Sequence, residues 1–219
     1  METPNMKIIV VTTMNQRLYD DYGHRFLKSY NWPFDCFIYH EDRMELVIDE
    51  HHYGKDGKTP FFYRDLFRET PHCKNFIDRN IHRQPISDFK EKGLDFITDG
   101  VRFSYKVYAY THAITTQEAD GLICIDADSI FHKSIDEEWI KNHIHRDDCM
   151  MSYLGRGEHY SECGFLYFNL NHKDTISYAN RMKSLYDTDG IHNLKEQHDS
   201  YIWDYVRKEF ENRGTKNHN

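Results

Sequence analysis

The stretch Gly121-Leu-Ile-Cys-Ile-Asp126-Ala-Asp128-Ser-Ile-Phe131 decides the fold class of this chain of 219 residues. Its short apolar run, residues 122–125, lies between an Asp-Gly pair and two acidic residues, which is typical of a buried strand. The sequence therefore predicts that Asp126 and Asp128 follow directly at the carboxyl end of this strand. Open α/β sheets bind their ligands at that edge.

Two interpretations of this pair of carboxylates are open. Like charges beside an apolar core repel one another and cost free energy unless a partner neutralises them. A divalent cation is such a partner, since carboxylate oxygens suit Mg²⁺, Mn²⁺ or Ca²⁺. In the other interpretation the Asp-x-Asp is an ordinary solvated turn, whose side chains bond the nearby backbone.

Before this strand, the sequence predicts a β-α-β unit. Residues 7–12 form a continuous apolar run, which is typical of the central strand of a parallel sheet. Residues 16–30 carry apolar side chains at helical spacing, and residues 34–40 form a second strand. A β-α-β start of this kind is typical of nucleotide-binding sheets.

The aromatic-rich middle of the chain carries no motif. We expect a short strand at residues 46–48, a loop at 51–59, and short helices at 60–68 and 72–79. A longer helix at 101–116 then precedes the Asp-x-Asp strand.

Arg102 and Lys106 lie four residues apart on that longer helix and so share one face of it. Further along, Ser134 with Glu137 three positions later predicts a capping box at the start of a short helix. The remaining expected elements are strands at 149–154 and 164–170, helices at 174–186 and 196–210, and a polar, flexible tail at about 212–219.

This alternation predicts an α/β fold with a mixed, mostly parallel sheet flanked by helices. No linker rich in Pro, Gly and Ser divides the chain, so residues 1–219 are expected to form a single domain. The net charge of −8 argues against a nucleic-acid partner.

The five cysteines form no Cys-x-x-Cys pair and are expected to be reduced, as in a reducing compartment. The start of the chain does not resemble a signal peptide, and no apolar stretch is long enough for a membrane span, so we expect a cytoplasmic protein.

Several motifs now stand in one order along the chain. A strand ends in Thr-Thr, and a helix with Arg102 and Lys106 precedes the Asp-x-Asp strand. Glu162-Cys-Gly-Phe-Leu-Tyr-Phe-Asn169 follows, and then His198-Asp199-Ser200 opens a helix. Over about residues 7–210 this order resembles the glycosyltransferases of the GT-A fold, enzymes that use nucleotide sugars and carry an Asp-x-Asp motif. It is most similar to glycogenin-like and related small bacterial or viral transferases.

The resemblance implies a Rossmann-like single domain and a role for each motif at the donor. Asp126 and Asp128 would hold Mn²⁺ or Mg²⁺ against the diphosphate of the nucleotide sugar, with Ala127 beside the donor. Thr12 and Tyr39 would meet the base and ribose. Arg102 and Lys106 would face the diphosphate or the sugar.

The resemblance also implies residues on the acceptor side, where this chain departs from the family. Asp199 matches the Asp of the family's Asp-Gln motif, but Ser200 follows it here. Asp199 and Glu162 are the candidate catalytic residues near the sugar and the acceptor. The family often supplies a third metal ligand near the carboxyl terminus, for which His198 and His218 are the candidates, His198 being a weak one.

Each candidate has an ordinary structural role as well. Arg102 and Lys106 are equally typical of a solvated helix face, and Glu162 of a surface carboxylate. Asp199 stands where a helix N-cap is expected, and the scattered histidines are typical of the surface.

The predicted function is metal-dependent transfer of a hexose, from a UDP-sugar by resemblance, to the hydroxyl of an acceptor that no motif identifies. One alternative is a haloacid-dehalogenase-like phosphatase with Asp126 as nucleophile beside Asp128, although that family's motif usually sits on the first strand. The other is a sugar-nucleotide-binding module that has lost catalysis, against which the intact aspartates argue.

Overall fold

The computed structural model describes residues 5–41, 61–83 and 92–219. A six-stranded sheet of these residues has the order β3-β2-β1-β4-β6-β5. Its strands are β1 (Ile8–Met14), β2 (Asp35–His40), β3 (Phe61–Asp65), β4 (Gly121–Ile125), β5 (Met151–Arg156) and β6 (His159–Asn169). Neighbours among β1 to β4 run parallel, whereas β6 is antiparallel to β4 and β5 to β6. The predicted α/β class with a mixed, mostly parallel sheet is confirmed. The predictions for 46–48 and 51–59 lie outside the described residues.

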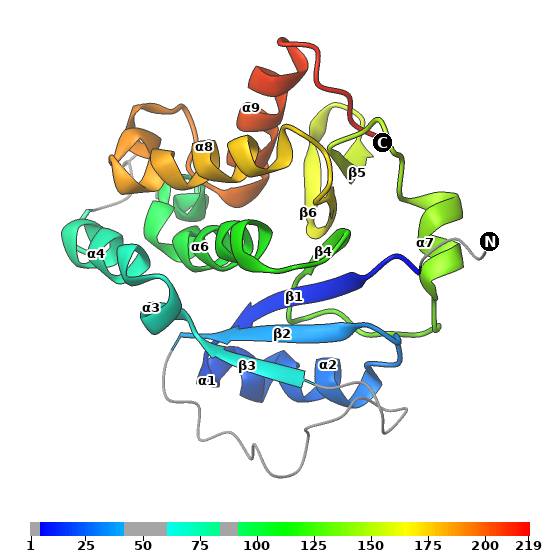
Figure 1. The fold of residues 1–219 in the computed structure, drawn as a ribbon. Helices are drawn as coiled ribbons and strands as arrows, with labels where there is room; N and C mark the ends of the chain where they lie inside the picture. Colours follow the sequence, from blue (N-terminus) through cyan, green and yellow to red (C-terminus); the bar gives the residue numbers. More distant parts are fainter. Residues whose placement is uncertain (1–4, 42–60, 84–91) are drawn as a thin grey trace.

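Helices cover both faces of this sheet (Figure 1). One face carries α3 (Leu66–Glu69), α4 (Pro71–Asn80), α6 (Gly100–Thr116), α8 (Thr175–Asp187) and α9 (Asp199–Glu211). The other face carries α1 (Gln16–Leu18), a π-helical turn at Tyr19–Gly23, and α2 (His24–Ser29). Two short 3₁₀ turns at Asp95–Thr98 and Gly190–Asn193 and the helix α7 (Glu137–His143) complete the described elements.

Strand β1 shows how the sequence produces two cores. Its alternate side chains point to opposite faces. Ile9 and Val11 pack among the residues of α6, α8 and α9, while Ile8 and Val10 pack with α2. β1 lies in the middle of the sheet, between β2 and β4, and is buried on both faces. A strand in that position needs the continuous apolar run that the sequence shows.

The prediction of a helix at residues 60–68 is wrong in its first half. Phe61–Asp65 forms the edge strand β3, and its Phe62 ring stacks on Phe37 of β2 with centroids 4.9 Å apart. Aromatic residues favour a half-buried pleated surface of this kind. The helix begins only at Leu66, after Asp65 accepts a hydrogen bond from the backbone N–H of Arg68 at 3.1 Å. The helix predicted at 72–79 is confirmed as α4.

The predicted capping box at Ser134 is also wrong. Asp136 caps α7 by accepting a hydrogen bond from the backbone N–H of Trp139 at 2.8 Å. The Ser134 hydroxyl instead donates to the carbonyl oxygen of Asn31 at 2.9 Å.

The tail at 212–219, expected to be flexible, is paired with the edge of the sheet. The backbone N–H of Met150 donates to the carbonyl of Lys216, and that of Tyr153 to the carbonyl of His218, at 2.9 and 3.0 Å. His218 returns a bond from its own N–H to Met151 at 2.9 Å. An edge strand such as β5 presents unpaired backbone groups, and the tail satisfies them.

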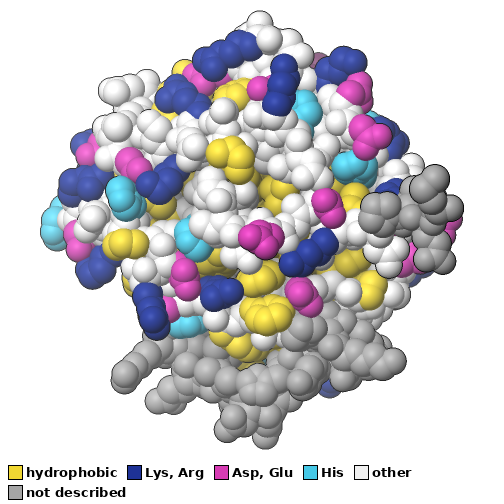
Figure 2. All heavy atoms as spheres, in the orientation of Figure 1, with side chains coloured by type: hydrophobic (Ala, Val, Ile, Leu, Met, Phe, Trp, Pro, Cys, Tyr) yellow, Lys and Arg dark blue, Asp and Glu magenta, His cyan; other side chains and the backbone are white. Residues whose placement is uncertain are grey.

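The distribution of surface charge, the state of the cysteines and the polarity of the helices complete the description. On the face seen in Figure 2, acidic and basic side chains are interspersed rather than gathered by sign. All five cysteines are free, and four of them are buried. Among the helices of the described residues, none is both long enough and apolar enough to cross a membrane.

Gly121, at the start of β4, must lack a side chain. A Cβ there would lie 2.5 Å from the hydroxyl oxygen of Tyr167, a buried residue whose hydroxyl lies 2.7 Å from Nδ1 of His145. We therefore expect Gly121→Ala to lower the free energy of unfolding by about 1–3 kcal/mol, measured by urea denaturation. Gly190→Ala is the control, because its Cβ would meet nothing closer than 3.3 Å. Equal effects of the two changes would contradict this account of β4.

Candidate active site

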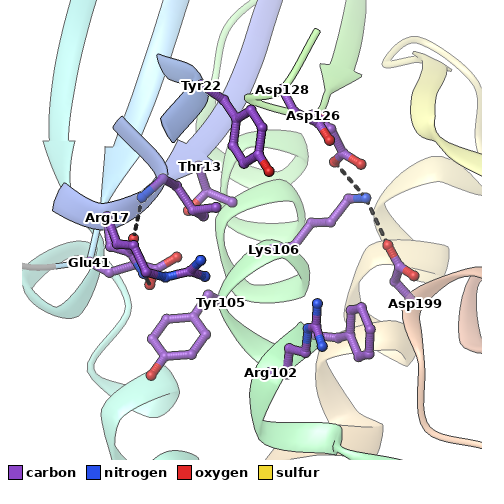
Figure 3. Close-up of a pocket in the computed structure, with 13 residues that line it drawn as sticks. Thr13, Arg17, Tyr22, Glu41, Arg102, Tyr105, Lys106, Asp126, Asp128 and Asp199 are labelled. Carbon is purple, nitrogen blue, oxygen red and sulfur yellow. Dashed lines mark hydrogen bonds and ion pairs between the residues drawn. The ribbon is translucent and has the colours of Figure 1, made fainter. Parts of the chain in front are cut away.

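A cavity of about 350 Å³ opens at the carboxyl ends of β1 and β4 (Figure 3). Its walls come from these two strand ends, from the first turns of α6 and from the start of α9. The lining residues are Thr13, Asn15, Arg17, Leu18, Tyr22, Glu41, Arg102, Phe103, Tyr105, Lys106, Asp126, Asp128 and Asp199. Five of the predicted site residues thus meet in one place: Arg102, Lys106, Asp126, Asp128 and Asp199.

Lys106 stands between two carboxylates in this cavity. Its ammonium nitrogen lies 2.7 Å from Oδ1 of Asp126 and 2.8 Å from Oδ2 of Asp199 (Figure 3). The lysine side chain is 10% exposed and that of Asp199 15%, whereas Asp126 retains 37%. Three elements distant in the sequence therefore meet at one buried ammonium group.

The pKa values of Lys106, Asp126 and Asp199 are shifted in different ways by this arrangement. Burial alone would lower the pKa of Lys106, but the attraction of Asp199 and Asp126 outweighs it, so that pKa is raised well above its usual value. Burial raises the pKa of Asp126, and Lys106 offsets this only in part. For Asp199 burial acts in the same direction, but Lys106 and the N–H of Ser200 outweigh it and its pKa is lowered. Asp199 is thus the firmer partner of the lysine.

The Asp-x-Asp turn presents both of its carboxylates to the cavity. The Asp126 N–H donates to the carbonyl of Gly164 on β6 at 3.1 Å, which holds the end of β4 against that strand. Asp128 is exposed and lines the cavity, while Ala127 between them is buried. Ala127 therefore contributes spacing, and no side chain of its own, to the lining.

The same turn has a donor set that fits Mg²⁺ or Mn²⁺. Within the described residues, no third His, Cys, Asp or Glu joins the two aspartates to make a metal cluster. Mg²⁺ is commonly held through one or two carboxylates, with substrate phosphates and water as its other ligands. Two carboxylates at the mouth of a cavity match that requirement.

His198 does not join the aspartates. Its Nδ1 accepts the backbone N–H of Tyr201 at 3.4 Å and so caps α9, the position considered for Asp199. Its Nε2 lies 2.9 Å from a carboxylate oxygen of Glu196. With both ring nitrogens engaged, the imidazole has no lone pair directed at a metal. His218, the other candidate, lies in the tail paired with β5.

Thr12 and Tyr39 also lie outside the cavity lining. Thr12 is fully buried, on the side of β1 that carries Ile8, Val10 and Met14. Tyr39 is fully buried too, and its hydroxyl oxygen lies 2.8 Å from Nδ1 of His112. The cavity is lined instead by Thr13, the next residue along the strand, because alternate strand residues face opposite sides.

Several lining residues were not predicted. Phe103 and Tyr105 belong to α6, and most of the others come from the turn after β1. Asn15 accepts the N–H of Leu18 at 2.9 Å, which caps α1, and its amide donates to Glu41 at 3.0 Å. β1 extends to Met14, two residues beyond the predicted end of the strand. The polar residues that follow the end of β1, together with Arg17 and Tyr22 from the first helical turns, are the sequence feature that could have indicated this part of the lining.

Glu162 lies next to the cavity, on the far side of Gly164. Its Oε1 accepts the N–H of Gly164 at 2.8 Å, and its Oε2 lies 3.0 Å from Arg156. A Cβ on Gly164 would be 3.1 Å from Oε1 of Glu162 and 3.4 Å from Oδ2 of Asp126. The absence of a side chain at Gly164 thus allows both carboxylates to pack closely against its backbone. Glu162 is not among the lining residues.

Comparison with known proteins gives the class of fold. No protein-family model and no curated protein matches the chain. The glycosyltransferase GlyE of Streptococcus pneumoniae TIGR4 matches 91% of this chain at 13% identity and a TM-score of 0.56, and its apo form matches 97% at 11% and 0.55. The apo structure of WbbM, a bifunctional glycosyltransferase, matches 94% at 10% identity and 0.54.

This likeness is one of fold. The chain spans less than half of the length of those three chains, 43%, 45% and 38% respectively. It has the α/β fold of the GT-A-type glycosyltransferases, as the order of its motifs predicted.

Proposed function

We propose that the protein transfers a sugar from a nucleoside diphosphate sugar, by resemblance a UDP-sugar, to an acceptor hydroxyl, with Mn²⁺ or Mg²⁺ as cofactor. The observation that carries this proposal is the pair Asp126 and Asp128, which open on one cavity at the carboxyl ends of β1 and β4. In an open α/β sheet this is the edge that binds ligands. The solved chains that share the fold are named glycosyltransferases.

The cavity has the volume of a small-molecule site and offers arginines to a diphosphate. Its volume of about 350 Å³ lies at the lower end of the range for small-molecule sites. Arg17 and Arg102 line it, and within the described residues no carboxylate lies within ion-pair distance of Arg102. An arginine of this kind can donate two hydrogen bonds to a phosphate. The diphosphate would therefore lie between Arg102 and the Asp-x-Asp turn.

The aspartates would hold the metal. A divalent cation there neutralises the charge that develops on the leaving nucleoside diphosphate. Asp126 and Asp128 would supply its protein ligands, and their place at the end of β4 fixes them at the mouth of the cavity.

Asp199 and Glu162 are suited to different tasks on the sugar side. Asp199 is ion-paired with Lys106 and its pKa is lowered, so it remains a carboxylate that accepts hydrogen bonds from sugar hydroxyls. Glu162 is 43% exposed, and Gly164 lies between its carboxylate and that of Asp126. It is the better placed of the two to take the proton of an attacking hydroxyl, which an inverting transfer requires.

The two alternative functions receive less support. A haloacid-dehalogenase-like phosphatase usually carries its Asp-x-Asp motif on the first strand, whereas here the motif follows β4. Against a binding module without catalysis stand the intact carboxylates of Asp126, Asp128 and Asp199, which all line one cavity. Neither alternative is favoured by an observation of its own.

A ligand screen tests the proposal directly. We expect UDP-sugars to raise the melting temperature only when Mn²⁺ is present, while GDP- and CMP-sugars do not. At a ligand concentration of 100 times Kd the gain is about 2.7 kcal/mol of stability. Measurement of released nucleoside diphosphate with and without acceptor sugars then follows. A chain that no nucleotide sugar stabilises with either metal would contradict the proposal.

A further inference from the structure

Lys106 occupies the position from which a cation would neutralise Asp126. Its ammonium is 2.7 Å from Oδ1 of this aspartate, and it reaches it from α6 while remaining 2.8 Å from Asp199 at the start of α9. Within the described residues, no other cation lies within ion-pair distance of either carboxylate. The lysine is therefore the counter-ion of these two aspartates.

The proposed function assigns Asp126 to a metal as well, and the following inference rests on that assignment. The ammonium takes up one acceptor site of Oδ1 of Asp126, which leaves fewer of its lone pairs for a metal. The positive charge of the lysine also repels a second cation placed beside the same carboxylate. Lys106 and a divalent cation therefore oppose one another at Asp126.

We propose that Lys106 is a built-in competitor of the divalent cation at Asp126, which keeps the affinity for metal alone low and makes metal and donor bind together. Asp199 retains the ammonium when Asp126 turns to the metal, since it is the more deeply buried of the two carboxylates. The diphosphate supplies oxygen ligands to the metal and a negative partner to the released ammonium. Each ligand thus lowers the cost of binding the other, and by thermodynamic linkage the coupling is equal in both directions.

A purely structural role for Lys106 has a different consequence. If the lysine only fixed Asp126 in place, its removal would disorder a metal ligand and weaken metal binding. Competition predicts the opposite sign, because removal of the ammonium takes the repelling positive charge away from Asp126, which is 37% exposed to an incoming cation. The sign of the change in metal affinity distinguishes the two roles.

The test is a titration of the purified chain with Mn²⁺ alone, followed by electron paramagnetic resonance of the free ion. We expect Lys106→Met to bind Mn²⁺ about tenfold more tightly than the wild type, a difference of ~1.4 kcal/mol. Lys74→Met is the matched control, since Lys74 is exposed and pairs with Asp78 at 2.8 Å, away from the cavity lining. Its Mn²⁺ affinity should equal that of the wild type.

A second titration in the presence of UDP measures the coupling. UDP should tighten Mn²⁺ binding of the wild type by a larger factor than that of Lys106→Met, because the variant has no competitor left to displace. If Lys106→Met does not fold, Lys106→Gln removes the charge and retains two N–H donors for the aspartates, and the same increase in affinity is expected.

The outcomes separate this inference from the proposed function. If the folded variants bind Mn²⁺ no more tightly than the wild type, while the wild type binds it with UDP, competition by Lys106 is refuted and the metal-dependent function stands. If the wild type binds no Mn²⁺ even with UDP, both fail.

Discussion

Asp128→Asn is expected to abolish metal-dependent turnover while leaving the fold intact. Asp128 is exposed at the mouth of the cavity, and within the described residues it has no ion-pair partner, so the change removes a charge without breaking a structural contact. Loss of one preorganised electrostatic group at a site of developing charge typically lowers kcat by about 10²–10³-fold. An amide oxygen is also a poorer ligand for a hard cation than a carboxylate oxygen.

The measurement is the rate of nucleoside diphosphate release at saturating Mn²⁺, together with the melting temperature. Asp78→Asn is a suitable control, because it removes the same charge from an exposed side chain of α4 that pairs with Lys74. Its rate should equal that of the wild type. Full activity in Asp128→Asn would show that the Asp-x-Asp turn is not the metal site.

Asp126→Asn is less informative, although Asp126 belongs to the same turn. Asp126 is a partner of Lys106, so its substitution also disturbs a buried ion pair, and a loss of activity would have two causes. Comparison of the two variants is nevertheless useful. A lowered melting temperature is expected for Asp126→Asn and not for Asp128→Asn.

The parts of the fold that the sequence predicted are those in which local pattern and burial agree. β1 and β4 are buried on both faces, so their apolar runs are unbroken, and 3.6-residue spacing marked α6 correctly. The carboxylates at the end of β4 follow from the same pattern, because the strand fixes where its last residue points. For these elements, a few neighbouring residues contain the information.

The predictions that were wrong concern residues whose structure is determined by tertiary contacts. The run Phe61–Asp65 has no clear period, and only pairing with β2 makes it a strand. The sequence predicts Thr12 at the site, whereas Thr13 lines the cavity. A shift of one residue in a strand reverses the face, and local pattern does not define the end of β1.

Local sequence pattern could not predict the ion pair between Lys106 and Asp199. It joins residues 93 positions apart, and it exists only because α6 and the start of α9 pack beside the end of β4. Pattern placed both residues at the donor, but not in contact with each other. The sequence suggested that Lys106 faces the diphosphate. In the structure its ammonium group is ion-paired with two aspartates.

A second buried ion pair predicts the largest loss of stability. Asp204 on α9 is 7% exposed and Arg207 is 8% exposed, with 3.0 Å between Oδ1 and Nη2. Asp204 also accepts the N–H of Ser161 on β6 at 3.0 Å, and the Arg207 guanidinium lies 4.0 Å above the ring of Tyr153 on β5. These contacts therefore connect α9, which begins at Asp199, to the β5–β6 hairpin, which carries Glu162.

Asp204→Ala is expected to destabilise the protein by about 3 kcal/mol, because it leaves the buried N–H of Ser161 without its acceptor and removes the buried partner of Arg207. Arg207 keeps one carboxylate partner, the partly exposed Glu211 at 2.6 Å, which limits the loss. Urea denaturation measures the loss. The double variant Asp204→Leu/Arg207→Met should recover part of it, since two apolar side chains leave no buried charge. Asp78→Ala breaks an exposed pair and should cost no more than about 0.5 kcal/mol. If Asp204→Ala were as mild as Asp78→Ala, the attachment of α9 to the β5–β6 hairpin would have to depend on its apolar contacts alone, and the position of Asp199 would not depend on this pair.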